Sequence, residues 1–256
     1  MDNQDIQAYN CRVFDYPAGQ HVTFYKNAIN KGGKKNANLR KDYQNTERTE
    51  QEEKHCNSVS ASATKNRIYN ISRSNEWEWF ITTTFGRKNV DASNYDVVIK
   101  KLQTFLEHLR ERKCPDLKYL IVPELHDDKI NFHFHGLLAN CGKMRFEFSG
   151  HYTKGRNAQP IFNLPDWSYG FTTATRIQDS ARASSYICKY ITKDCARKLK
   201  EKNKYYCSHN VNRVKPEYSV QDEEDFLKVY SDRITYIKSI EVKEAGQIVT
   251  YYELKD

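Results

Sequence analysis

Two histidines, His133 and His135, stand one residue apart with a phenylalanine between them. Side chains alternate between the faces of a β-strand, so in a strand both imidazoles share one face and Phe134 takes the other. Two imidazoles on one face can bind one divalent cation. A His-x-His pair is also common by chance, and an imidazole often bonds only a neighbouring backbone group, so the pair needs support from its surroundings.

A third metal ligand has to come from a neighbouring strand. Residues 117–124 form a strand-like run, residues 126–129 a polar turn and residues 131–139 a returning strand, which together predict an antiparallel hairpin. Glu124 lies across this hairpin from the histidines, and His126 is the alternative ligand. Two imidazoles and one carboxylate leave positions open for water and a phosphate oxygen, as Mg²⁺ or Mn²⁺ needs for phosphoryl chemistry.

A second reactive set lies in a Tyr-x-x-Lys unit that occurs twice in succession. On a helix over residues 180–194, this spacing gathers phenols and ammonium groups in one stripe, formed by Tyr186, Lys189, Tyr190 and Lys193. A phenol is a weak nucleophile at its ordinary pKa of about 10, but an adjacent ammonium and a metal-polarised phosphate make attack on a phosphodiester feasible. The alternative is ordinary packing of half-buried tyrosines beside solvated lysines.

The two phenols are not equivalent along the sequence. Tyr186 opens the first unit, and Lys189 and Lys193 follow it by one and two helical turns. Tyr186 also lies nearer the helix start, where the helix dipole favours a developing phenolate or a bound phosphate. We therefore expect Tyr186 to be the primary nucleophile and Tyr190 a second nucleophile or a phosphate-orienting hydroxyl.

The segments around these residues predict alternating strands and helices. Residues 77–85 indicate a central strand, because both of its faces carry apolar side chains. A helix follows, capped by Ser93 or Asn94 and ended by Cys114-Pro115. Further strands are expected at residues 12–16, 21–25, 170–177, 234–242 and 247–254, and further helices at 58–73 and 222–230.

The order of these motifs resembles a known superfamily. A strand at residues 80–85, the His-x-His strand and the Tyr-x-x-Lys helix are similar to the three motifs of HUH single-strand endonucleases, closest to rolling-circle replication initiators of bacteriophages and mobile elements. The resemblance covers residues 77–193. It implies metal binding by His133 and His135, with Glu124 as third ligand, and a tyrosine that forms a 5′-phosphotyrosine link and leaves a free 3′-OH. The doubled tyrosine resembles two-tyrosine initiators, although single-tyrosine relatives share the Tyr-x-x-Lys form.

The expected fold is α+β. A central antiparallel sheet carries residues 80–85 and 133–135 in its middle and helices on its faces, as in the RRM-like core that the resemblance implies. We expect an N-terminal β-hairpin (1–26), a polar linker or mobile arm (27–57), the endonuclease core (58–195) and a basic C-terminal extension with a helix and a β-hairpin (196–256). Lysines of this extension suit contact with the DNA backbone, namely Lys198, Lys200, Lys202 and Lys204.

Composition narrows the partners. Lys and Arg exceed Asp and Glu by 41 to 33, and aromatic residues make up 13% of the chain, which suits a surface that binds phosphates and stacks unpaired bases. A basic excess also serves solubility alone. The longest apolar stretch, residues 119–122, excludes a membrane span. A polar start and cysteines without a C-x-x-C pattern favour the cytoplasm, here that of a bacterial host cell.

These observations predict an enzyme that nicks and rejoins single-stranded DNA at an origin, with Mg²⁺ or Mn²⁺ as cofactor. The chain has no GxxxxGK[ST] motif, so a host helicase and polymerase are the expected partners. One alternative is a non-catalytic single-stranded DNA-binding or replication-control protein, which would not cut DNA. Another is a metal-dependent nuclease with water as nucleophile, which would leave no protein on the DNA.

Overall fold

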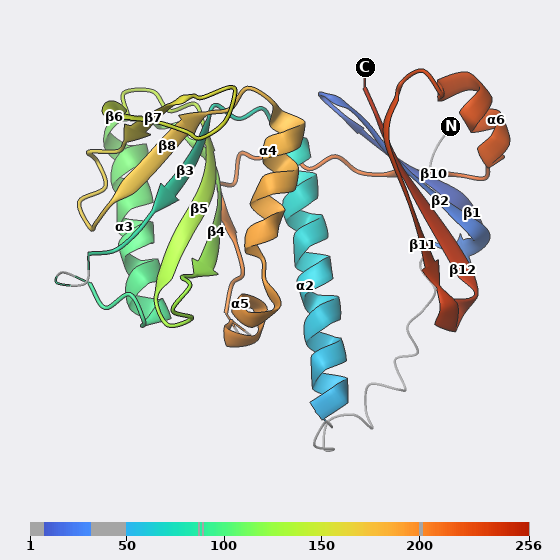
Figure 1. Ribbon diagram of the computed structural model, residues 1–256, viewed down its shortest axis with the longest axis horizontal. Coiled ribbons are helices and arrows are strands. Elements are labelled where there is room, and N and C mark those ends of the chain that lie inside the picture. Colours follow the sequence, from blue (N-terminus) through green and yellow to red (C-terminus); the bar gives the residue numbers. More distant parts are fainter. Residues whose placement is uncertain (1–7, 32–49, 87, 89, 200–201, 256) are drawn as a thin grey trace. The chain divides into compact units, whose positions relative to one another are not determined.

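The computed structural model describes residues 8–31, 50–86, 88, 90–199 and 202–255. The chain divides into two compact units, one formed by residues 50–213 and one by the two ends of the chain, residues 1–49 and 214–256 (Figure 1). Each unit has its own antiparallel sheet and at least one helix, which confirms the predicted α+β class.

The larger unit is built on a seven-stranded sheet with the order β6-β7-β8-β3-β5-β4-β9. The two strands predicted to be central, β3 (Trp79–Thr83) and β5 (Phe132–Ala139), are direct neighbours in its middle. The other strands are β4 (Lys118–Leu125), β6 (Glu147–Tyr152), β7 (Pro160–Asn163), β8 (Thr172–Arg176) and β9 (Tyr206–Cys207).

Helices cover both faces of this sheet, as Figure 1 shows. Helix α3 (Tyr95–Arg112) packs on the face that carries Phe132 and Phe134, and its buried residues form one core with them. On the opposite face, α2 (Glu50–Arg73) and α4 (Ser180–Ile187) form a second core, with Leu120 and Leu137 from the sheet. The histidine pair lies on this second face, because residues 133, 135 and 137 alternate with the two phenylalanines.

The α3 helix forms as predicted. The Asn94 side chain accepts hydrogen bonds from the backbone N–H groups of Asp96 and Val97, which satisfies donors that the first turn leaves free. The apolar positions Val98, Leu102, Phe105 and Leu109 are all buried against the sheet. The helix ends at Arg112, just before the Cys114-Pro115 pair.

A tight turn joins β4 to β5. Asp128 accepts hydrogen bonds from the backbone N–H groups of Ile130 and Asn131, both at 2.9 Å, and Lys129 adopts the left-handed conformation with φ of 55°. The turn fixes the register of the hairpin, in which Glu124 pairs directly with His133. The predicted hairpin is therefore confirmed, and its register brings the three candidate metal ligands together.

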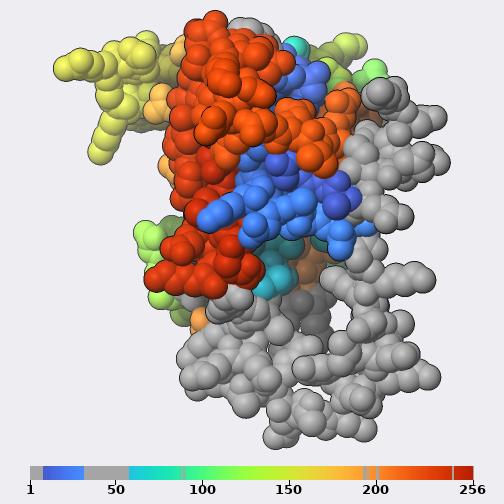
Figure 2. All heavy atoms as spheres, turned by 90° about the vertical axis from the view of Figure 1, so that its right-hand side faces the viewer, coloured from blue at the N-terminus to red at the C-terminus, as the bar shows by residue number. Residues whose placement is uncertain are grey.

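The smaller unit joins strands from both ends of the chain. Its sheet has the order β10-β1-β2-β12-β11, so the N-terminal hairpin pairs with the C-terminal hairpin through β2 and β12. Figure 2 shows the two ends of the chain, blue and red, in one continuous surface. The elements are β1 (Ala8–Tyr16), β2 (Gly19–Asn30), β10 (Glu217–Ser219), α6 (Glu223–Tyr230), β11 (Ile234–Val242) and β12 (Gln247–Leu254).

The structure differs from the expected domain boundaries in three places. The N-terminal hairpin and the C-terminal extension are not separate additions, because Phe24 and Tyr252 share one buried core with Phe226. The expected linker over residues 27–57 is shorter, since β2 runs to Asn30 and α2 begins at Glu50. The middle of that linker, residues 32–49, lies outside the described residues. Strands β6 and β7 were not expected at all.

Within the part of the chain that the structure describes, helices are too short or too polar to cross a bilayer.

Candidate active site

A carboxylate and two imidazoles meet on the face of the sheet that α2 and α4 cover. Glu124 Oε2 lies 2.7 Å from His133 Nε2 and 2.8 Å from His135 Nε2. The ligand atoms of these three residues all lie within 4.8 Å of one another. The structure thus brings together the three side chains that the sequence proposes as metal ligands. His126 is not in this group; its ring packs edge-on against His133 at 5.6 Å.

The strand next to β5 orients His135. In the register of β3 and β5, Thr82 pairs with His135, and Thr82 Oγ1 lies 3.0 Å from His135 Nδ1. The hydroxyl can donate to Nδ1 while the Nε2–H donates to Glu124, a pattern that fits a neutral ring. Burial lowers the pKa of His135, which favours this neutral form, the one that binds metals. Thr82 was not singled out from the sequence.

Glu124 remains ionised over the ordinary pH range. Burial raises the pKa of its carboxyl, but hydrogen bonds from His133 and His135 outweigh this effect and lower the pKa to about 2. A carboxylate and two neutral imidazoles form a donor set that suits a divalent cation, with positions left open for other ligands. The donor set therefore fits the metal site that the resemblance implies.

The Tyr-x-x-Lys segment is not one continuous helix, and the predicted single stripe is wrong. Helix α4 ends at Ile187, a 3₁₀ turn spans Cys188–Tyr190, and Ile191 leaves the helical conformation with ψ of 81°. Thr192 then caps a new helix, α5 (Lys193–Lys198), through its hydroxyl and the Cys195 N–H. The two buried isoleucines anchor both sides of this break to the sheet.

The break keeps the two tyrosines together and brings one of them onto the histidine pair. The Tyr190 ring stacks on the His135 ring, with centroids 3.5 Å apart and planes 13° apart. The Tyr186 ring meets Tyr190 edge-on at 5.4 Å and packs against Phe80 at 5.3 Å. Phenols and candidate metal ligands thus form one contiguous cluster.

The two tyrosines differ in exposure and in acidity. Tyr186 is 45% exposed, whereas Tyr190 is half-buried. Burial, together with a hydrogen bond to Tyr186 and the charge of Glu124, raises the pKa of Tyr190. Tyr190 therefore keeps its proton and can donate it in a hydrogen bond to the Tyr186 oxygen. This arrangement favours negative charge on Tyr186 rather than on Tyr190.

The lysines of the two units separate at the break. Lys189 Nζ lies 5.1 Å from the centroid of the Tyr186 ring, so one ammonium stays beside a candidate nucleophile. Lys193 begins α5 beyond the break, and its side chain lies outside the described part of the structure. The expected pairing of Tyr186 with two ammonium groups is thus reduced to the contact with Lys189.

The C-terminal lysines have partners within the protein. Lys198 donates to the Ile130 carbonyl at 2.9 Å, Lys202 to Asp96 at 2.6 Å and Lys204 to the Ser60 hydroxyl at 2.5 Å. Lys200 lies outside the described residues. These ammonium groups help to dock the segment after α5 onto the larger unit. Contact of this row with DNA stays a prediction.

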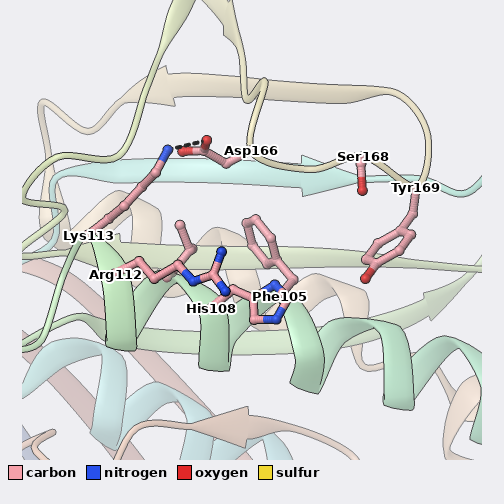
Figure 3. A pocket seen from close by; sticks show the side chains of 8 residues that line it. Phe105, His108, Arg112, Lys113, Asp166, Ser168 and Tyr169 are labelled. Carbon is pink, nitrogen blue, oxygen red and sulfur yellow. Dashed lines mark hydrogen bonds and ion pairs between the residues drawn. The ribbon is translucent and has the colours of Figure 1, made fainter.

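A small pocket of about 160 Å³ lies on α3, on the opposite face of the sheet from the histidines (Figure 3). Asp166 faces Lys113 across it, with Lys113 Nζ 2.5 Å from Asp166 Oδ1. Burial raises the pKa of Asp166, but hydrogen bonds from Lys113 and the Arg145 N–H outweigh this and lower it. This pocket holds a structural ion pair that ties α3 to the loop after β7.

Asp166→Asn is expected to make the stability of the protein less sensitive to acid. The folded pKa lies below the ordinary value of 3.8, so the contribution of the carboxylate is complete above that value and is lost as the pH falls through the lower folded pKa. Urea midpoints measured between about pH 2 and 5 should fall less steeply in the variant than in the wild type. The exposed Asp116→Asn should follow the wild type. Identical slopes for wild type and Asp166→Asn would refute this account.

One comparison with known proteins gives a match. The family model for replication-associated proteins of the ORF2 type matches residues 78–195. This range runs from the start of β3 to α5, close to the range of the resemblance, and it contains the histidine pair, Glu124 and both tyrosines. Searches of curated proteins and of solved structures find no match. The similarity supports a role in DNA replication.

Proposed function

We propose that this protein is a replication initiator of the HUH class, which cuts single-stranded DNA at an origin by tyrosine attack and rejoins it. The observation that carries the proposal is the stacking of Tyr190 on His135, because it joins the tyrosine pair to the candidate metal ligands. The similarity of residues 78–195 to a replication-associated family supports the same role. A host helicase and polymerase in the bacterial cytoplasm would act with it.

Glu124, His133 and His135 would hold the cation, Mg²⁺ or Mn²⁺, which polarises the scissile phosphate when bound. The protein keeps these ligands in place without it. The Thr82 hydroxyl fixes the rotation of the His135 ring, and the hairpin register fixes Glu124 opposite His133. Ligands held in this way lose little conformational freedom on binding.

The cleavage step follows from the position of the two phenols. The Tyr186 hydroxyl loses its proton, and its oxygen forms a bond to phosphorus. The bond between phosphorus and the 3′ oxygen breaks, and that oxygen takes up a proton to become a free 3′-OH. Tyr190 donates a hydrogen bond to the Tyr186 oxygen, and the Lys189 ammonium lies beside the ring as negative charge develops. The reverse attack by a 3′-OH rejoins the strand.

The products of cleavage test this function against its alternatives. A randomised library of single-stranded DNA incubated with the protein and Mn²⁺ should yield strands whose 3′ ends prime a DNA polymerase directly. Their 5′ ends should resist ligation, because a tyrosine blocks them. Cut strands with 5′ phosphates that ligate would indicate water as nucleophile. Binding without any cutting would indicate a non-catalytic single-stranded DNA-binding protein.

A further inference from the structure

A cleft of about 540 Å³ borders the tyrosine pair at the edge where β8 runs into α4. The segment that connects β6 to β7 forms one wall, the end of β8 forms the floor, and α4 forms the other wall. Tyr186 and Phe80 belong to its lining, so the cleft opens directly beside the candidate nucleophile. No motif of the sequence pointed to it, because its residues come from three separate segments.

The charge of this cleft is predominantly positive. Its described lining includes the exposed cationic side chains of Lys154, Arg156, Arg176 and Arg182. The acid in this lining is Asp179, whose Oδ1 accepts the Arg182 backbone N–H at 2.9 Å as the cap of α4. The carboxylate therefore serves the helix start, and the surplus of cations faces the cleft. Such a surplus attracts the phosphates of a nucleic acid.

The uncharged lining suits unpaired bases. The Phe80 and Tyr186 rings meet at 5.3 Å and present aromatic surface at the inner end of the cleft. Side-chain amides line the remainder, from Asn157, Gln159 and Gln178. Rings stack on bases, and amides can both donate to and accept from base edges that are not already paired. In a duplex these base faces are stacked and unavailable, so the lining favours a single strand.

We propose that this cleft binds the segment of single-stranded DNA next to the scissile phosphate and delivers it to Tyr186. The inference rests on the proposed function for the position of the cut, but binding in the cleft can be measured without cleavage. Lys154 and Arg156 contact phosphates, and the amide side chains contact bases. The cleft therefore sets the preference of the enzyme for nucleotides beside the cut.

The double variant Lys154→Ala/Arg156→Ala tests this binding. The matched control is Lys100→Ala/Lys143→Ala, which removes the same charge from exposed positions outside the cleft lining. Affinity for a fluorescent single-stranded oligonucleotide of mixed sequence is measured by anisotropy over a range of salt concentrations without divalent metal. The slope of log affinity against log salt should shrink by about 1.4 in the cleft variant, from two lost phosphate contacts at about 0.7 each.

Two separate readouts keep the cleft and the proposed function apart. Both double variants should unfold at the same urea concentration as the wild type, because all four side chains are exposed. Equal slopes and affinities for the cleft variant and the control would overturn the cleft, even if the wild type still cuts DNA. A reduced slope in the cleft variant alone would support the cleft, even if the wild type forms no cut strands.

Discussion

Replacement of His135 by alanine is expected to lower the rate of strand cleavage by ~100-fold or more, from the loss of several kcal/mol of phosphate polarisation. Affinity for single-stranded DNA should stay within about twofold, because phosphate and stacking contacts dominate binding. His135 is 7% exposed, and its Nε2 shares Glu124 Oε2 with His133. Single-turnover cleavage with Mn²⁺ and anisotropy titrations without metal separate the two effects.

The matched control for this prediction is His126→Ala. Its ring packs against His133, yet it lies outside the group of three ligand atoms. The variant should retain cleavage within a few-fold of the wild type and respond to Mn²⁺ at the same concentrations. If His126→Ala abolishes cleavage while His135→Ala leaves it intact, the ligand set assigned to the cation is wrong.

Tyr186→Phe is expected to remove most of the first cleavage event, by ~100-fold or more in single-turnover rate, because the attacking oxygen is lost. Tyr190→Phe should have a smaller effect on that event, since it removes a hydrogen bond to the Tyr186 oxygen and leaves the nucleophile in place. Both changes keep the aromatic ring, so the packing on Phe80 and His135 is retained. Differences between the variants therefore report on the hydroxyls.

The opposite ranking would reverse these roles. If Tyr186→Phe cuts at the wild-type rate and Tyr190→Phe does not, Tyr190 is the primary nucleophile. Loss of strand rejoining in Tyr190→Phe, with the first cut preserved, would support alternating use of the two phenols. The assay for rejoining supplies a second strand with a free 3′-OH and measures the recombinant product.

The metal ligands could be predicted because they depend on local rules. Strand alternation places His133 and His135 on one face, and a short hairpin with a polar turn fixes Glu124 opposite them. Helix α3 was equally predictable, since its cap and its apolar period lie within one segment. Each of these features requires information from neighbouring residues alone.

The break in the Tyr-x-x-Lys segment was missed because the spacing of its residues fits a continuous helix. A signal was present in Thr192, a favoured N-cap residue, but the same residue type also occurs within helices. Burial of Ile187 and Ile191 against the sheet decides between the two readings. That burial depends on tertiary packing, which the local pattern does not contain.

Pairing over long sequence distance was also out of reach of the local pattern. The two terminal hairpins were each predicted, but their union through β2 and β12 joins residues more than two hundred positions apart, such as Phe24 and Thr250. Strand β6 has mostly exposed side chains, so it lacks the alternation that indicates a half-buried strand. The cleft beside Tyr186 depends on both kinds of information.

Mass spectrometry of the protein after cleavage tests the central claim most directly. The wild type is incubated with a randomised single-stranded library and Mn²⁺, separated on a denaturing gel and digested with nuclease and protease. We expect a covalent protein–DNA adduct that EDTA prevents, with a nucleotide attached through phosphate to Tyr186, or to Tyr186 and Tyr190 when both phenols react. Efficient metal-dependent cutting with no nucleotide on either tyrosine would contradict tyrosine attack at this site.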